Sequence, residues 1–424
     1  MKKRIKNITM LFFGILTLTL LVACGGKSDT ASSSNETILK FQIWDTNQKS
    51  GMEKMAEAFT KENPTIKVEV EVTPWDQYWT KLQAAATGGN MADIFWMHPD
   101  QIYTFEEGGA MLDLTEKIKE NKIDLSKFPE YISDGYNVNG KQYAIPKDFS
   151  TIGLWYNKDI FDAADVAYPD DTWTWKELMS AAEKLTDKEK GIYGMLAPAN
   201  GQNFWYNLVW QNGSDLISED GKKTMLGDPK TIEALKFGVS FIENGYSPTT
   251  ADFANTTADQ YFESGKAAMI TSGSWMASEY LSIDTLNTDV APMPKGEQRG
   301  SVSSGMGYAI AANTKHEEEA WKFLAFLSGE KANKIQAESG AAIPALEGTQ
   351  TPWVETFPKI NAQVFVDAAE YGHASMNTPS RASWVETEQD YANQIFSLAI
   401  DVEKGSKEMA KKAQSEIDEY FEQP

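Results

Sequence analysis

The side chains that most often carry out catalysis are sparse in this sequence of 424 residues. The three histidines, His98, His316 and His373, form no HExxH motif and no pair spaced for one helix face. The sequence also lacks a G-x-S-x-G nucleophile elbow, a phosphate-binding loop and an Asp-rich calcium loop. Carboxylates are abundant, so a glycosidase pair stays open, because only the fold sets the distance between two carboxyl groups. We therefore predict no catalytic set, no metal site and no cofactor.

Side chains that suit recognition of a ligand are much more numerous. The sequence contains 13 Trp and 16 Tyr, and aromatic faces stack well on flat, partly apolar molecules. Packing in the interior must account for many of these rings. Aromatic rings that do not pack in the interior are typical of a binding site.

The elements expected at the start of the folded chain would bring several candidate residues together. Alternating apolar residues predict strands at 38–44, 66–72 and 93–97, with helices at 52–59 and 75–87. Strands that alternate with helices indicate an α/β lobe with a largely parallel sheet, and ligands bind beyond the carboxyl ends of such strands. Three pairs of residues follow these strands and are expected at one rim: Trp44 with Asp45, Trp75 with Asp76, and Trp96 with His98.

The rest of the chain is more helical. Trp321 lies on the apolar face of one predicted helix and is expected in the core. Residues 38–424 exceed what a single hydrophobic core usually serves, so two lobes are expected. Helices are predicted at 175–185, 198–212, 231–244 and 317–327, with two more from about Trp384, and strands at 266–271 and 308–312.

The only cysteine, Cys24, closes a segment typical of export. Four basic residues among the first six precede an uncharged apolar run at 8–22, which is too short for an ordinary membrane span and fits a signal peptide. The run ends in Leu-Val-Ala-Cys-Gly, which resembles the bacterial lipobox, where the thiol receives a diacylglycerol. We predict a signal peptide at 1–23, lipidation of Cys24 and a lipidated flexible tether at 24–37. A plain secretory signal with a stray cysteine is the alternative.

The charge of the chain restricts its partners. The formal net charge is −22, and removal of residues 1–23 leaves 35 basic and 61 acidic residues. Such a surface repels nucleic acid and anionic lipid and keeps a protein soluble and monomeric. We therefore expect no nucleic-acid partner and a monomer.

Several stretches of the chain, taken in order, form a recognisable pattern. They are the opening strand through Trp44 and Asp45, ADIFWM at 92–97, YAIPKDFSTIGLWYNKDIF at 143–161, AAMITSGSW at 267–275, GMGYAIAANTKHEEEAWKFLAFL at 305–327, and the late Ser383-Trp384 pair. Together they resemble the extracellular solute-binding proteins of sugar importers, the family that includes the maltodextrin-binding protein. The resemblance covers essentially the whole mature chain.

The resemblance implies a periplasmic-binding-protein type II fold, in which two α/β lobes are joined by a hinge and a ligand cleft lies between them. It implies that the chain crosses between lobes near 147–150, 303–305 and 337–345. The first lobe would comprise 38–148 and 304–337, and the second lobe 149–303 and 338–424.

The resemblance also implies which residues bind ligand. Planar polar side chains would bind sugar hydroxyls, and aromatic rings would stack on the C–H faces of the sugar. Trp275 follows a strand and a glycine-rich turn, where the family has a stacking aromatic residue. The predicted set is Trp44, Asp45, Trp75, Asp76, His98, Lys147, Asp148, Trp205, Tyr206, Trp275, Gly305, Met306, Arg381 and Trp384.

Several of these residues have a second interpretation. Asp45 could instead cap the helix that follows it, and Trp75 could pack on its own helix. Lys147 and Asp148 could form a salt bridge at the hinge in place of holding two sugar hydroxyls. Trp205 could belong to the core, while Gly305 and Met306 would approach a ligand through their backbone.

The expected function is capture of a carbohydrate, with an oligosaccharide favoured by the number of Trp residues, and its delivery to the membrane permease of an ABC importer. The protein would carry out no chemistry and would stand on the outer face of a plasma membrane, in the manner of a Gram-positive lipoprotein. Alternatives are a binding protein for a polyamine or a glycerol phosphate ester, a surface glycosidase, and an adhesin.

Overall fold

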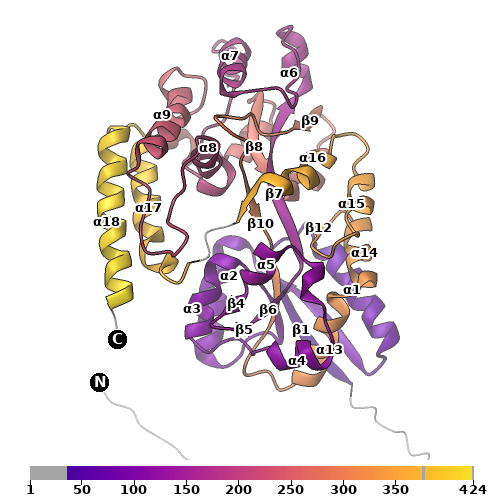
Figure 1. Ribbon diagram of the computed structural model, residues 1–424. Coiled ribbons are helices and arrows are strands. Elements are labelled where there is room, and N and C mark those ends of the chain that lie inside the picture. The colour runs from indigo at the N-terminus through magenta and orange to yellow at the C-terminus, as the bar shows by residue number, and fades with distance from the viewer. Residues whose placement is uncertain (1–35, 375–377, 423–424) are drawn as a thin grey trace, which may run out of the picture. The chain divides into compact units, whose positions relative to one another are not determined.

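The computed structural model describes residues 36–374 and 378–422. The predictions for the signal peptide and for Cys24 therefore lie outside the described residues. Strands and helices alternate from β1 to β3, as expected for an α/β protein, and longer runs of helices and strands follow (Figure 1).

The first sheet contains five strands in the order β2-β1-β3-β11-β6. Strand β1 pairs in parallel with β2 and β3, whereas β11 pairs antiparallel with β3 and β6. The three predicted strands at the start of the chain are thus confirmed, and a strand from late in the sequence is inserted beside them. The five strands are β1 (Thr37–Ile43), β2 (Ile66–Val72), β3 (Ile94–Met97), β6 (Ala144–Pro146) and β11 (Gly307–Ile310).

Helices connect the strands of the first sheet. Helix α1 buries Met52, Met55, Ala56 and Phe59 on one face, as the spacing predicted. Helix α2 ends at Gly89, whose φ of 69° is the left-handed conformation that glycine adopts most easily. These helices are α1 (Lys49–Glu62), α2 (Trp75–Gly88), α3 (Ile102–Glu107), α4 (Thr115–Glu120), α5 (Glu130–Asp134), α13 (Glu317–Leu327) and α14 (Glu330–Glu338).

The second sheet is built around one long strand, β7 (Asp148–Asn157). The strand order is β12-β7-β10-β13, and β8 and β9 pair with the distal part of β7 (Figure 1). A short hairpin of β4 (Asn137–Val138) and β5 (Lys141–Gln142) stands apart from both sheets. The other strands are β8 (Met269–Gly273), β9 (Thr288–Ala291), β10 (Ser301–Ser304), β12 (Ile343–Pro344) and β13 (Gly372–Ala374).

The predicted helices and strands around the second sheet are found, but two of them begin later than predicted. The predicted helix at 198–212 begins later, with a π-helical turn at Gly201–Trp205 that the Asn200 side chain caps through the Asn203 amide. The strand predicted at 266–271 is shifted to β8. These helices are α6 (Lys158–Ala163), α7 (Trp175–Leu185), α8 (Tyr206–Gln211), α9 (Pro229–Glu243), α10 (Thr250–Phe253), α11 (Ala258–Glu263), α12 (Ala277–Leu281), α15 (Thr351–Thr356), α16 (Gln363–Asp367), α17 (Arg381–Phe396) and α18 (Val402–Glu422).

The buried side chains form two hydrophobic clusters. The first includes Phe41, Trp96 and Trp321, and Trp321 is only 4% exposed, which confirms its predicted place in the core. The second includes Trp205 and Trp384. Among the described residues, no helix has the length and apolar character that crossing a bilayer requires.

The chain passes between the two sheets at three places that meet around Lys147. The first passage joins β6 to β7, the second joins β10 to β11, and the third leads from α14 to β12. The Lys147 amide donates to the Met306 carbonyl over 2.7 Å, and the Lys147 carbonyl accepts from the Gln336 side chain over 3.2 Å. Backbone and side-chain hydrogen bonds therefore tie all three passages to one residue.

The side chains of Lys147 and Asp148 form a buried ion pair at the same point. The Lys147 ammonium also donates to Gln48 over 2.8 Å and lies 4.4 Å from the centre of the Trp96 ring. Asp148 accepts a hydrogen bond of 2.9 Å from the Met306 amide. Because the side chain of Lys147 has no solvent-exposed surface, the hinge salt-bridge interpretation holds and the prediction of direct ligand contact by Lys147 is not supported.

The Lys147→Met substitution keeps most of the side-chain volume and removes the charge. It should lower the free energy of unfolding by about 3–5 kcal/mol, because Asp148 would then be left buried without its cation. Urea unfolding followed by tryptophan fluorescence would measure this change. Lys331→Met breaks a solvent-exposed ion pair with Glu62 and serves as the control, with an expected loss of about 1 kcal/mol or less. Equal losses in the two variants would contradict the prediction.

Candidate functional site

A cavity of about 510 Å³ lies where the first sheet, the crossovers and the second sheet meet, and we call it the aromatic cleft. The first sheet contributes residues that follow its strands, the crossovers contribute the floor, and the second sheet contributes the opposite wall. The lining residues are Trp44, Asp45, Asn47, Gln48, Trp75, His98, Asp148, Phe149, Ser150, Asn200, Gln202, Asn203, Ser274, Trp275, Met276, Glu279, Met306 and Ala342.

Four of the six residues predicted at the rim line the cleft, whereas the expectation for Trp96 is wrong because its side chain is fully buried in the first hydrophobic cluster. Trp44 and Asp45 follow β1, Trp75 begins α2 after β2, and His98 follows β3. All four line the aromatic cleft. Asp76, in the first turn of α2, is exposed and does not line the cavity.

Trp44 and Trp75 line the first wall of the cleft, and Trp44 supports the more exposed ring of Trp75. Trp44 is held edge-to-face by Trp75 and Trp96, with ring centres 5.3 and 5.0 Å away. Trp75 is itself 46% exposed, a large value for so apolar a side chain. The interpretation that Trp75 only packs on its own helix therefore fails, and its ring stands as a platform supported by the cluster below.

Trp275 approaches the cleft from the opposite wall. It follows β8 in a single 3-10 turn, Ser274–Met276, and its ring is half-buried over the preceding backbone. A Cβ atom added at Gly273 would lie 2.0 Å from that ring. The glycine therefore allows the ring to fold back over the chain, and Trp75 and Trp275 line the same cavity.

The polar groups of the first wall are held by local hydrogen bonds. Asp45 accepts from the Asn47 amide over 2.8 Å and from the Gln48 side chain over 2.9 Å, so it organises the turn ahead of α1 and also lines the cleft. His98 is 5% exposed, and its Nδ1 accepts from the Asp100 amide over 3.2 Å. Its Nε2 therefore carries the proton in the neutral ring and is the nitrogen that can donate to a ligand.

Burial lowers the pKa of His98, although the carboxylates of Asp100 and Asp148 act in the opposite direction. The ring is thus kept neutral near pH 7. Neutral donors and acceptors suit a ligand that presents hydroxyl groups.

Sequence reasoning missed much of the second wall. Asn200, Gln202 and Asn203 supply three side-chain amides to the cleft, and Glu279 supplies a carboxylate that accepts from Asn47 over 3.0 Å. The prediction of a helix at 198–212 had placed these amides inside that helix. The Asn200-Gly201 dipeptide, a typical turn signal, was the feature that could have placed them in a loop.

Four predicted residues belong to a cluster in the second hydrophobic core. Trp205 and Trp384 are 1% and 0% exposed, so neither offers a stacking face in this conformation. The Arg381 guanidinium lies 4.2 Å from the Trp384 ring centre and pairs with Glu388, and Tyr206 also bonds to Glu388. None of the four lines the aromatic cleft.

The remaining predicted residues are at the crossovers. Asp148 and Met306 line the aromatic cleft, whereas Gly305 lines a separate cavity. The Met306 amide and carbonyl are already bonded to Asp148 and Lys147, and the Gly305 carbonyl accepts from Tyr136. These backbone groups hold the hinge together. Within the described ranges, no group of three or more His, Cys, Asp or Glu side chains is placed to hold a metal ion.

Comparisons with known proteins place this geometry in context. The model of the family described as bacterial extracellular solute-binding protein matches residues 44–334. The galactooligosaccharide-binding protein of Bacillus subtilis is 26% identical over 339 residues, 77% of each chain. The maltodextrin-binding protein MdxE of the same organism is 28% identical over 344 residues, again 77% of each chain.

A solved structure gives the same result for the fold. The ABC substrate-binding protein Lmo0181 of Listeria monocytogenes, in complex with cycloalternan, superposes with a TM-score of 0.85 at 26% identity, over 90% of this chain and 99% of that one. The predicted type II fold, with two α/β lobes and a cleft between them, is thereby confirmed.

The pKa of His98 yields a test of its buried position. Because this pKa is lower in the folded chain than in the unfolded chain, the unfolded state binds more protons as the pH falls through about 6.5. Stability should therefore decrease more steeply between about pH 7.5 and about pH 5.5 in the wild type than in His98→Asn, in which the side chain cannot be protonated. Thermal unfolding at a series of pH values would measure this, and parallel curves would contradict it.

Proposed function

Because the chain belongs to the bacterial extracellular solute-binding protein family, we propose that it captures a carbohydrate in the aromatic cleft and delivers it to the membrane permease of an ABC-type importer. An oligosaccharide is the proposed ligand. The observation that carries this proposal is the exposed ring of Trp75, which stands in a cavity that also contains side-chain amides and carboxylates.

The side chains of the cleft suit both the apolar faces and the polar edge of a sugar ring. The C–H faces of a pyranose ring stack on aromatic side chains, and Trp75 and Trp275 supply such faces. The hydroxyls at the sugar edge need donors and acceptors in one plane. Asn200, Gln202 and the Nε2 of His98 can fill those roles.

The composition of the lining disfavours the other solutes. None of the described residues that line the cleft is Lys or Arg, so a glycerol phosphate ester would lack its counter-charge. A polyamine would need several free carboxylates. Asp76 does not line the cleft, and Asp148 is already paired with Lys147.

A hydrolytic role receives no support from the carboxylates of the cleft. Asp45, Asp148 and Glu279 each hold a structural hydrogen bond, to Gln48, the Met306 amide and Asn47 respectively. The proposed function is therefore binding without chemical conversion of the sugar.

Closure of the lobes would couple binding to delivery. The proposed lobes are 38–148 with 304–337, and 149–303 with 338–424, which move about the crossovers near Lys147. Away from the crossovers, the side-chain hydrogen bonds between the two sides include Asn47 to Glu279 over 3.0 Å and Tyr420 to Glu107 over 2.9 Å. Opening would break both, so ligand contacts that span the cleft favour the closed form.

We also propose that the mature protein is a monomer held at the outer face of the plasma membrane by lipid on Cys24, after removal of residues 1–23. The sequence Leu-Val-Ala-Cys-Gly and the polar segment that follows it support this. The tether would keep the folded part near its permease.

The ligand class can be tested by thermal unfolding against maltodextrins and raffinose-type, fructo- and xylo-oligosaccharides. A bound sugar at 100 times its dissociation constant should add about 2.7 kcal/mol of stability. The sugar should be recovered unchanged after long incubation, as expected of a binding protein. A shift with spermidine or glycerol phosphate and with none of the sugars would reject the proposal.

The platform role of the tryptophans is tested by Trp75→Ala and Trp275→Ala. Each should weaken binding of the responding sugar by about 2 kcal/mol, or roughly thirtyfold, because a stacking face is lost from a concave site. Isothermal titration calorimetry would measure the affinity. Tyr168→Ala removes an exposed aromatic side chain that does not line the cleft and should bind as the wild type does.

The membrane anchor is tested by cell fractionation of Cys24→Ala. The wild-type protein should sediment with membranes, and the variant should be recovered in the soluble fraction or the medium because no thiol is present to receive the lipid. Identical distributions of the two proteins would reject lipidation at this residue.

A further inference from the structure

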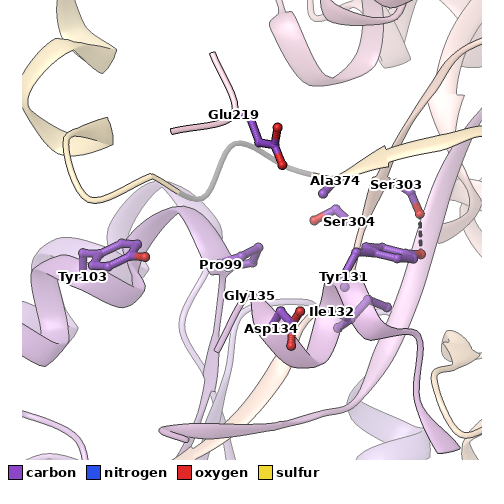
Figure 2. A pocket seen from close by; sticks show the side chains of 11 residues that line it. Pro99, Tyr103, Tyr131, Ile132, Asp134, Gly135, Glu219, Ser303, Ser304 and Ala374 are labelled. Carbon is purple, nitrogen blue, oxygen red and sulfur yellow. Dashed lines mark hydrogen bonds between the residues drawn. The ribbon is translucent and has the colours of Figure 1, made fainter. Parts of the chain in front are cut away.

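A second cavity, of about 620 Å³, lies beside the aromatic cleft. Figure 2 shows its walls: Tyr103 and Asp134 come from α3 and α5 of the first sheet's side, and Glu219 comes from the loop ahead of α9. Its floor is formed by Ser303, Ser304 and Gly305 at the second crossover. Among the residues of this cavity, Gly305 is the one that was predicted from the sequence to contact ligand.

The two cavities lie next to each other over the same crossover strands. His98 lines the aromatic cleft and its neighbour Pro99 lines the second cavity. Ser150 of β7 lines the cleft, and it pairs directly with Ser304 of β10, which lines the second cavity. Side chains of directly paired residues point to the same face of an antiparallel ladder and stand about 5 Å apart. One extended ligand can therefore reach both cavities.

The second cavity contains a polar group without a partner. The Ser304 hydroxyl is buried and has no hydrogen-bond partner among the described residues, and Figure 2 shows its side chain beside the open space next to Pro99. The neighbouring Ser303 hydroxyl, in contrast, is bonded to Tyr131 over 2.6 Å. An unpaired buried hydroxyl is costly, and a ligand hydroxyl would satisfy it.

The charged side chains that line the second cavity are of one sign. Asp134 and Glu219 are exposed carboxylates on opposite sides of the opening (Figure 2), and the described lining includes neither Lys nor Arg. The aromatic cleft has the same property. A ligand that carried a carboxylate would meet like charge, and no Lys or Arg, in the described linings along this path.

We propose that the second cavity binds further units of the ligand held in the aromatic cleft, so that the substrate class is an oligosaccharide longer than a disaccharide and without acidic groups. This inference rests on the proposed function. The aromatic cleft binds one end of the chain by stacking, and the second cavity binds the other end through the Ser304 hydroxyl and the Tyr103 side chain.

A chain-length series tests the proposal. The probes are neutral oligosaccharides of two to six units from the class that gives the largest thermal shift, and calorimetry gives the affinity of each. Affinity should rise with length in the wild type. Ser304→Ala and Tyr103→Ala should each weaken the longer members about tenfold and leave the disaccharide unchanged.

Ser304→Ala is a sharp probe because it removes a hydroxyl that holds no other residue, so the unliganded protein should be at least as stable as the wild type. Trp75→Ala is the matched variant for the aromatic cleft and should weaken every length equally. If the Ser304 and Tyr103 variants change all lengths alike, or none, the second cavity does not bind ligand.

The exclusion of acidic ligands has its own test. An oligosaccharide that ends in a uronic acid should bind about tenfold more weakly than the neutral chain of the same length, and Asp134→Asn combined with Glu219→Gln should remove most of that difference. Equal affinity of the neutral and acidic chains for the wild type would overturn the charge selectivity. Failure of every sugar to bind would instead reject the proposed function itself.

Discussion

The buried pair of Lys147 and Asp148 is the constraint on which the rest of the structure depends. Its position is enforced by three segments distant in sequence: Gln48 ahead of α1, Met306 at the second crossover and Gln336 in α14. A charge in a low-dielectric interior must keep its partners, because an unpaired buried ion costs several kcal/mol. The pair therefore fixes the register of the crossovers, and with it the floor of the aromatic cleft.

The same pair influences what the cleft can bind. Asp148 lines the cavity, yet its charge is compensated from beneath by Lys147, whose ammonium also rests on the Trp96 ring. Trp96 in turn supports Trp44, which supports Trp75. A chain of contacts thus runs from the hinge to the exposed platform, so the stacking surface is held by rigid packing before any ligand arrives.

Acidic charge and aromatic surface act together in this protein. The chain carries 61 acidic residues against 39 basic ones, and the described linings of both cavities contain no Lys or Arg. Apolar faces and neutral hydrogen-bonding groups remain as the sources of attraction. That combination favours a neutral, hydroxylated ligand over an anion, and the neutral ring of His98 adds a donor without adding charge.

Local sequence determined the elements and part of the site. Period-two and period-3.6 patterns located the strands and helices of the first sheet, and because strand ends meet at one edge, Trp44, Asp45, Trp75 and His98 were placed correctly at a shared rim. The resemblance to a family supplied the type II fold. Neither could say whether a given ring packs inward or faces a cavity, since that depends on neighbours far away in the sequence.

Only the tertiary structure decided those questions. Local sequence does not distinguish Trp205 and Trp384 from Trp275. Packing of α8, α9 and α17 buries the first two side chains, whereas Gly273 allows the ring of Trp275 to fold over its own backbone beside the cleft. The position of the amides at 200–203 and the second cavity could not be predicted from the sequence either, because the walls of both cavities combine segments from both sheets. Burial is a property of long-range contacts, and no local pattern of residues contains it.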